Sequence, residues 1–210
     1  MFRVNGILVI LSPIIVLYIR FYNMNINDII NSIHKLPPTS LDTLIASILE
    51  VEYPKRFHLH RENKKETKSY FIKKGIVRAY AHKDGKEITF WFGQEGDLIF
   101  PLQTLFAGLG EYATVELLED CVLYEIDLER LQDLYQSDIH IANWGRRYAE
   151  CACIKSEKLF IARQFKTSLE RYRELINEYP DIIQRVQLGI IASYLGISQV
   201  NLSRIRARIK

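Results

Sequence analysis

The hydrophobic period of the sequence changes twice along the chain, and these changes limit the folds available to it. Between about residues 50 and 126, apolar residues recur in short runs with a period near two, which is typical of β-strands. On both sides of this stretch, the apolar residues are spaced as on one face of a helix. The sequence therefore predicts an α+β protein in which a strand-rich unit is flanked by helices.

Turn residues divide the strand-rich stretch into short pieces. Asp84 and Gly85 separate two strand-like runs, and a type I′ turn needs positive φ at both central positions, which this pair tolerates. Five more glycines punctuate the stretch as turns would: Gly75, Gly93, Gly96, Gly108 and Gly110. Many short strands with regular turns predict a β-sandwich or barrel.

The flanking stretches predict a series of helices. Two short ones are expected at residues 26–35 and 40–49, with Pro37 and Pro38 as a break, and another at 128–138. A long helix is expected over 139–164, and its apolar stripe comprises Ile141, Trp144, Tyr148, Ala152, Lys155, Leu159 and Ala162. A second copy of the chain or the β-unit itself could cover this stripe, and both could do so at once.

A new unit of about 45 residues begins near residue 166. Thr167 and Glu170 form a capping box that starts a helix, and Pro180 ends it after about Tyr179. Further on, Gly196 ends a second helix and Ser198 is a good N-cap for a third. The inward positions of these last two helices are apolar or small: Ile191, Ala192, Leu195, Leu202, Ile205 and Ile209. Two helices joined by a short turn that contains glycine are typical of a helix-turn-helix.

The outward face of the last helix is polar and basic. It presents Gln199, Asn201, Ser203, Arg204, Arg206 and Arg208, and no Asp or Glu occurs from Gln187 to the end of the chain. The net charge of the whole chain is only +3, so the basic excess is local to this end. A solvated basic tail is the simpler interpretation, but amide and guanidinium groups on one helix suit base edges and phosphates. We therefore expect this helix to bind DNA.

From Met24 onward, the order of elements resembles the cyclic-AMP receptor/Fnr family of bacterial transcription regulators. Three stretches carry the resemblance: FIKKGIVRAY, EGDLI and IASYLGISQVNLSRIRARI, and the last is similar to regulators from Bacteroidetes-type bacteria. It implies a double-stranded β-roll of the cyclic-nucleotide-binding jelly-roll type, a long dimerisation helix and a C-terminal helix-turn-helix, winged-helix-like with little or no wing. The implied units are an apolar extension, 1–23, an effector domain, 24–137, the dimerisation helix, 138–165, and a DNA-binding domain, 166–210.

The resemblance also implies partners. They are a second copy bound through residues 139–164, a two-fold-symmetric double-stranded operator and RNA polymerase, all in the cytoplasm. Two recognition helices of such a dimer lie about 34 Å apart, one turn of DNA. Val200 departs from the acidic residue common at its place in the family, and it can touch a thymine methyl but cannot accept a hydrogen bond from cytosine. The implied DNA-binding residues are Ser198, Gln199, Val200, Asn201, Ser203, Arg204, Arg206 and Arg208.

The effector site departs further from the family. Members that bind cyclic nucleotides use a Gly-Glu-Leu segment for the ribose and an Arg-Ser or Arg-Thr pair for the phosphate. The matching positions are Gly96, Asp97 and Leu98, then Glu111 and Tyr112, with Thr114 close by. A carboxylate repels a phosphate, so we expect no tight binding of a cyclic nucleotide and no bound cofactor. A regulator responsive to a cyclic nucleotide or another small molecule remains the alternative, with a pocket or a core built from Phe90, Trp91, Phe92, Phe100 and Phe106.

The remaining reactive residues offer little chemistry. The three cysteines, Cys121, Cys151 and Cys153, form no C-x-x-C pair, so a disulfide scaffold or a structural zinc site is not expected and a reducing compartment fits. His58 and His60 alternate on one strand face, and two imidazoles are too few for a metal site, so a solvated face is expected. We find no nucleophile–base spacing and no phosphate-cradling glycine loop, so we do not expect an enzyme.

The first residues raise a separate question. Gly6–Ile19 is an apolar run with Pro13 in its middle, shorter than the roughly 20 apolar residues of a spanning helix. A normal soluble sequence begins at Met24. Residues 1–23 are therefore expected to be a translation-start artefact, and a membrane anchor is the alternative.

Overall fold

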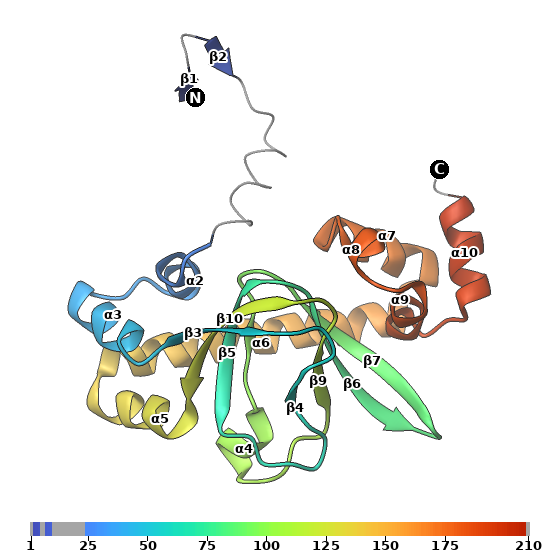
Figure 1. Cartoon of the computed structure of the whole chain (residues 1–210). Helices are drawn as coiled ribbons and strands as arrows, with labels where there is room; N and C mark the ends of the chain where they lie inside the picture. Colours follow the sequence, from blue (N-terminus) through green and yellow to red (C-terminus); the bar gives the residue numbers. More distant parts are fainter. Residues whose placement is uncertain (1, 5–6, 10–23, 209–210) are drawn as a thin grey trace.

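The computed structural model describes residues 2–4, 7–9 and 24–208 (Figure 1). A two-stranded antiparallel pair comes first, β1 (Phe2–Val4) with β2 (Ile7–Val9). Most of the apolar run lies outside the described residues, so both explanations of residues 1–23 stay predictions. Among the residues that are described, no helix is both long and apolar enough to cross a membrane.

The strand-rich stretch folds into two four-stranded antiparallel sheets. One sheet has the order β3-β10-β5-β8 and the other β4-β9-β6-β7. Apolar side chains from both sheets meet between them, and Ile72, Val77 and Leu123 are fully buried there. The prediction of a double-stranded β-roll is confirmed. The strands are β3 (Leu49–Tyr53), β4 (His58–His60), β5 (Lys68–Lys74), β6 (Val77–Lys83), β7 (Lys86–Gly93), β8 (Leu98–Ile99), β9 (Thr114–Leu117) and β10 (Cys121–Asp127).

The predicted hairpin turn is confirmed. Strands β6 and β7 pair up to Lys83 and Lys86, and between them Asp84 and Gly85 have φ values of 52° and 73°. One other turn admits glycine alone. Gly75 has a φ of 123°, and a Cβ there would lie 2.2 Å from the Cys121 sulfur.

Helices flank the roll on the N-terminal side and follow it directly. They are α2 (Ile26–Ile33), α3 (Pro38–Ile45), α5 (Leu128–Ser137) and α6 (Ile139–Phe165). The bounds predicted for α3 were wrong. Pro38 belongs to its first turn, where proline needs no N–H partner, and the chain enters β3 soon after Ile45. The short helix α4 (Leu102–Ala107) was not predicted, because six residues show too little periodicity.

The stripe of α6 packs on its own chain. Ile141 and Trp144 are fully buried, and the Trp144 indole N–H donates to the Ile30 carbonyl at 3.0 Å. Farther along, Tyr148 packs on Phe100 with ring centroids 4.9 Å apart. The sequence left open whether the β-unit or a second copy covers this stripe. Within the chain, the β-unit and the N-terminal helices cover it.

Up to Arg208, the C-terminal unit has four helices: α7 (Ser168–Glu178), α8 (Ile182–Arg185), α9 (Leu188–Leu195) and α10 (Gln199–Ala207). The capping box of Thr167 and Glu170 is confirmed. The apolar cluster of this unit also includes Ile76, Phe92 and Leu118 of the roll. The helical unit is thus joined to the roll by a shared core and not only by the end of α6 (Figure 1).

Candidate functional site

Helices α9 and α10 have the predicted helix-turn-helix geometry. Gly196 lies in the left-handed region at φ 66° and ends α9, and the Ser198 hydroxyl accepts from the Asn201 N–H at 3.2 Å. Ile209 lies outside the described residues. The other predicted inward residues are all buried: Ile191, Ala192, Leu195, Leu202 and Ile205.

The two helices approach closely at a residue that the sequence analysis missed. A Cβ on Gly189 would lie only 2.4 Å from the Gln199 side-chain nitrogen, so the Gln199 amide lies against α9. A glycine inside an apolar helical run was the available signal for such a close contact. Ala192, the small residue expected at the crossing, is buried as well.

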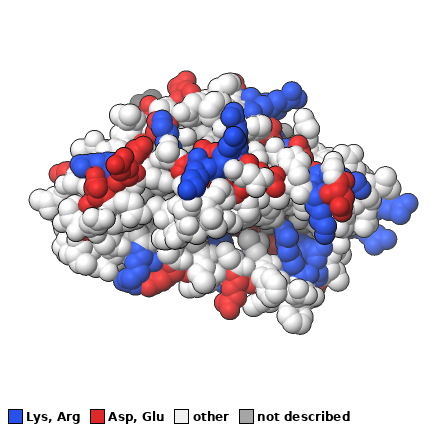
Figure 2. Space-filling model, turned by 90° about the horizontal axis from the view of Figure 1, so that it is seen from below, with Lys and Arg blue, Asp and Glu red and all other residues white. Residues whose placement is uncertain are grey.

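The outward face of α10 is exposed, although the Gln199 amide lies against α9. All eight predicted DNA-binding residues are exposed, from Ser198 to Arg208, and Val200 is 63 % exposed. Within residues 24–208, no acidic side chain pairs with Arg204, Arg206 or Arg208. Elsewhere, basic and acidic side chains lie side by side, as on the face in Figure 2. The unpaired guanidinium groups of α10 are therefore available to phosphates and base edges.

Strand β7 holds the helix-turn-helix against the roll. The Ser193 hydroxyl of α9 accepts from the Thr89 N–H at 3.0 Å and donates to the Glu87 carbonyl at 2.9 Å. Nearby, the Tyr179 hydroxyl donates to the Phe92 carbonyl at 2.9 Å. Because β7 is the edge strand of its sheet, these side chains use backbone groups that no strand pairs with on that side.

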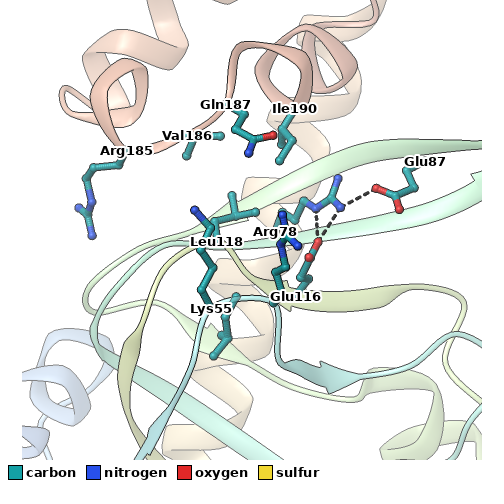
Figure 3. A pocket seen from close by; sticks show the side chains of 11 residues that line it. Lys55, Arg78, Glu87, Glu116, Leu118, Arg185, Val186, Gln187 and Ile190 are labelled. Atoms are coloured by element: carbon teal, nitrogen blue, oxygen red, sulfur yellow. Dashed lines mark hydrogen bonds and ion pairs between the residues drawn. The ribbon is translucent and has the colours of Figure 1, made fainter.

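A small cavity of about 230 Å³ separates the two units beside this contact (Figure 3). On the roll side, Arg78 is paired at 2.5 Å with both Glu87 and Glu116. On the helical side, Arg185 is paired with Glu95 at 2.8 Å and with Glu119. The second arginine therefore ties the helical unit to the roll by ion pairs.

A larger cavity of about 540 Å³ lies between the roll and α6, and we call it the effector cavity. A volume of this size is in the range of small-molecule sites. Its walls are mainly apolar and include Phe90, Trp91, Leu98, Phe100, Leu159 and Phe160. Strand β7 contributes two of these residues and α6 another two.

Five of the six residues predicted for an effector site line this cavity: Gly96, Asp97, Leu98, Glu111 and Tyr112. The sixth does not. Thr114 is buried outside the lining, and its hydroxyl accepts from the Glu62 N–H at 3.2 Å. Of the aromatic candidates, Phe92 belongs to the core shared with the helical unit, and Phe106 is 71 % exposed.

The prediction that His58 and His60 lie on a solvated strand face was wrong for His60. His60 is 2 % exposed, its Nε2–H donates to the Lys68 carbonyl at 2.9 Å, and burial lowers the pKa of its imidazole. The strand pairing shifts between His58 and His60, which breaks the simple alternation of faces. Among the described residues, no three His, Cys, Asp or Glu side chains gather as a metal site would require.

Comparison with known proteins agrees with this architecture. Residues 50–138 match the model of the cyclic nucleotide-binding domain family, whereas no curated protein sequence matches the chain. Among solved structures, the c-di-GMP-responsive global regulator CLP of Xanthomonas campestris shares 17 % identity with a TM-score of 0.59, over 82 % of this chain and 91 % of that one.

Two further structures show the same fold. FixK2 from Bradyrhizobium japonicum has a TM-score of 0.64 at 19 % identity, over 77 % of this chain and 84 % of its own. A protein from Eubacterium rectale assigned to the Crp/Fnr family of transcriptional regulators has a TM-score of 0.65 at 19 % identity, over 81 % of this chain and 82 % of its own. At these identities, the likeness establishes the fold alone.

Proposed function

We propose that this protein is a DNA-binding transcription regulator. Its residues 50–138 match the model of the cyclic nucleotide-binding domain family, and its fold is that of Crp/Fnr-type regulators. It acts as a homodimer on a two-fold-symmetric operator, in contact with RNA polymerase in the cytoplasm. Its DNA-binding residues are Ser198, Gln199, Val200, Asn201, Ser203, Arg204, Arg206 and Arg208.

The exposed face of α10 is the observation that carries this proposal. Leu202 and Ile205 anchor the helix, and every polar or basic residue between and beyond them up to Arg208 points away from the core. In a helix-turn-helix, this face enters the major groove, where arginine is bidentate to guanine and Gln or Asn pairs with adenine. A structural helical hairpin has the same buried residues but has no need of an acid-free outer face.

A second apolar face of α6 supports the dimer. Ile154, Ile161 and Phe165 recur at i, i+7 and i+11, which is one side of a helix, and they are 51 %, 46 % and 82 % exposed. This side differs from the stripe that packs on the roll. A second copy that pairs its own α6 with this side would bury both sets of residues around a two-fold axis.

Control by a cyclic nucleotide is not part of the proposal. The Glu111 carboxylate is buried in the wall of the effector cavity and accepts from the Thr104 N–H at 2.8 Å and the Thr104 hydroxyl at 2.9 Å. A phosphate placed beside it would meet a like charge in a partly desolvated site.

Selection of binding sites from a random double-stranded DNA pool tests the proposal with the full-length chain. We expect enrichment of an inverted repeat whose half-site centres lie about 10 base pairs apart or a multiple of that spacing. The matched variant Arg204→Ala should enrich a less defined sequence, because it lacks one base contact. Enrichment of no sequence by the wild type, or of the same sequence by both proteins, contradicts the assignment of α10.

A further inference from the structure

The side chains that line the effector cavity offer no buried, unpaired cation to an anionic ligand, and the buried Glu111 carboxylate has no cation partner among the described residues. Glu111 accepts two hydrogen bonds from Thr104. Asp97 accepts from the Gln94 N–H at 3.0 Å and pairs with Lys155 at 3.3 Å. Burial lowers the pKa of His60, which disfavours the cationic form of its imidazole. No buried cation of this wall is left to balance an anionic ligand, and the Glu111 carboxylate would repel one.

One further charged residue of the cavity lining is exposed. Arg163 is exposed, and its guanidinium donates to the Phe90 carbonyl at 3.5 Å, so it remains in contact with water. An exposed guanidinium attracts an anion only weakly, because solvent screens the charge. It therefore does not make the interior of the cavity an anion site.

The body of the cavity is apolar and aromatic. Phe90, Trp91, Phe100 and Leu159 present ring and methyl surfaces, and its volume of about 540 Å³ accommodates a small molecule. Burial of apolar surface in such a site is favourable by about 25 cal/mol per Å² before the costs of binding are paid. A phosphate in the same place loses its hydration without gaining a partner.

We propose that the effector cavity binds a largely apolar small molecule that carries no anionic group. This inference deepens the proposed regulator function and rests on it, since it names the chemical class of the effector. It also explains Glu111. A buried carboxylate that is bonded only to the neutral donors of Thr104 keeps its negative charge and so disfavours an anionic ligand.

Strand β7 gives such a ligand a route to the DNA-binding unit. Its residues Phe90 and Trp91 line the effector cavity, while its backbone at Glu87, Thr89 and Phe92 holds Ser193 and Tyr179. A ligand that moves this strand therefore moves the groups that position α9. Because one strand does both, the coupling needs no chain of intermediate residues.

The test uses the uncharged fluorescent probe N-phenyl-1-naphthylamine with the full-length chain. We expect saturable binding of one probe per chain, with no displacement by cyclic AMP, cyclic GMP or c-di-GMP. The variant Ala152→Phe fills the cavity from α6 and should weaken probe binding by about tenfold or more. The matched variant Ala149→Phe changes an exposed residue of α6 that does not line the cavity and should leave probe affinity unchanged.

Three results would overturn the inference: absence of saturable probe binding, displacement of the probe by a cyclic nucleotide, or equal affinity in both variants. If Ala152→Phe does not fold, Ser156→Trp at the exposed mouth fills the same cavity and replaces it. The DNA selection is scored separately. Probe binding without sequence enrichment supports the ligand class and refutes the regulator function. Sequence enrichment without probe binding supports the regulator function and refutes the ligand class.

Discussion

The outer face of α10 and the wall of the effector cavity differ in which of their charged side chains have partners. On α10, Arg204 and its neighbours stand exposed without a carboxylate partner in the described chain. In the cavity wall, the carboxylates of Glu111 and Asp97 are already bound by Thr104 and Lys155. A surface of unpaired cations suits a polyanion, and an apolar wall with a buried carboxylate suits a ligand without an anionic group. The proposed effector site and the proposed DNA-binding site are thus distinguished by the sign of their unpaired charges.

Loss of the proposed second copy should have the largest effect on DNA binding, because one α10 reaches only one half-site of the operator. Ile161→Glu places a charge in the exposed apolar side of α6, so we expect the dimer to dissociate. Operator affinity should fall about 100- to 10,000-fold with the loss of bivalent binding. Sedimentation and DNA titration measure the two effects. Ala149→Glu, on another side of α6, is the control, and a dimeric Ile161→Glu would refute the interface.

Removing one free charge from α10 should have the next largest effect. Arg204→Ala is expected to weaken specific binding by about 1–3 kcal/mol and to relax base preference at one position. Lys65→Ala removes an equally exposed charge from the roll and should change affinity little. Titration of operator variants against both proteins measures the difference. Equal losses in the two variants would show that only net charge matters.

Weakening the contact between strand β7 and helix α9 should have a smaller effect. Ser193→Ala removes the acceptor of the Thr89 N–H, so hydrogen exchange at that amide should become faster. The free energy of unfolding should fall by about 1–2 kcal/mol for the two lost hydrogen bonds. Exchange measured by NMR and chemical denaturation test this. Ser203→Ala, exposed on α10, should alter neither, and unchanged exchange at Thr89 in Ser193→Ala would contradict the role of β7.

The smallest expected effect comes from the buried imidazole beside the cavity. The pKa of His60 in the folded chain lies below its ordinary value of 6.5 because burial disfavours the charged form. The unfolded chain therefore takes up the proton first, and stability present above pH 6.5 is lost as the pH falls below it. Denaturation between pH 7.5 and 5.5 should show this loss, and His60→Gln should reduce it. The exposed His34 serves as control, and an unchanged pH dependence in His60→Gln would contradict this origin.

The sequence predicted correctly the turns and helix caps that neighbouring residues determine. The hairpin at Asp84 and Gly85, the capping box at Thr167 and the turn at Gly196 all occur as predicted, because neighbouring residues alone set those backbone angles and hydrogen bonds. The bounds of α3 and the existence of α4 were missed, because tertiary packing decides where short helices begin and end. The likeness to Bacteroidetes-type regulators stays a prediction.

The sequence by itself determined the alternation of helix and strand, the residues that join α9 to α10 and the basic face of α10. Each follows from periodicity or from residues a few positions apart. Only the tertiary structure decided that the stripe of α6 packs on the roll, that His60 is buried, that Thr114 is outside the cavity and that Thr104 binds Glu111. These contacts join residues on different elements, and their energies depend on burial and distance, which spacing along the chain does not reveal.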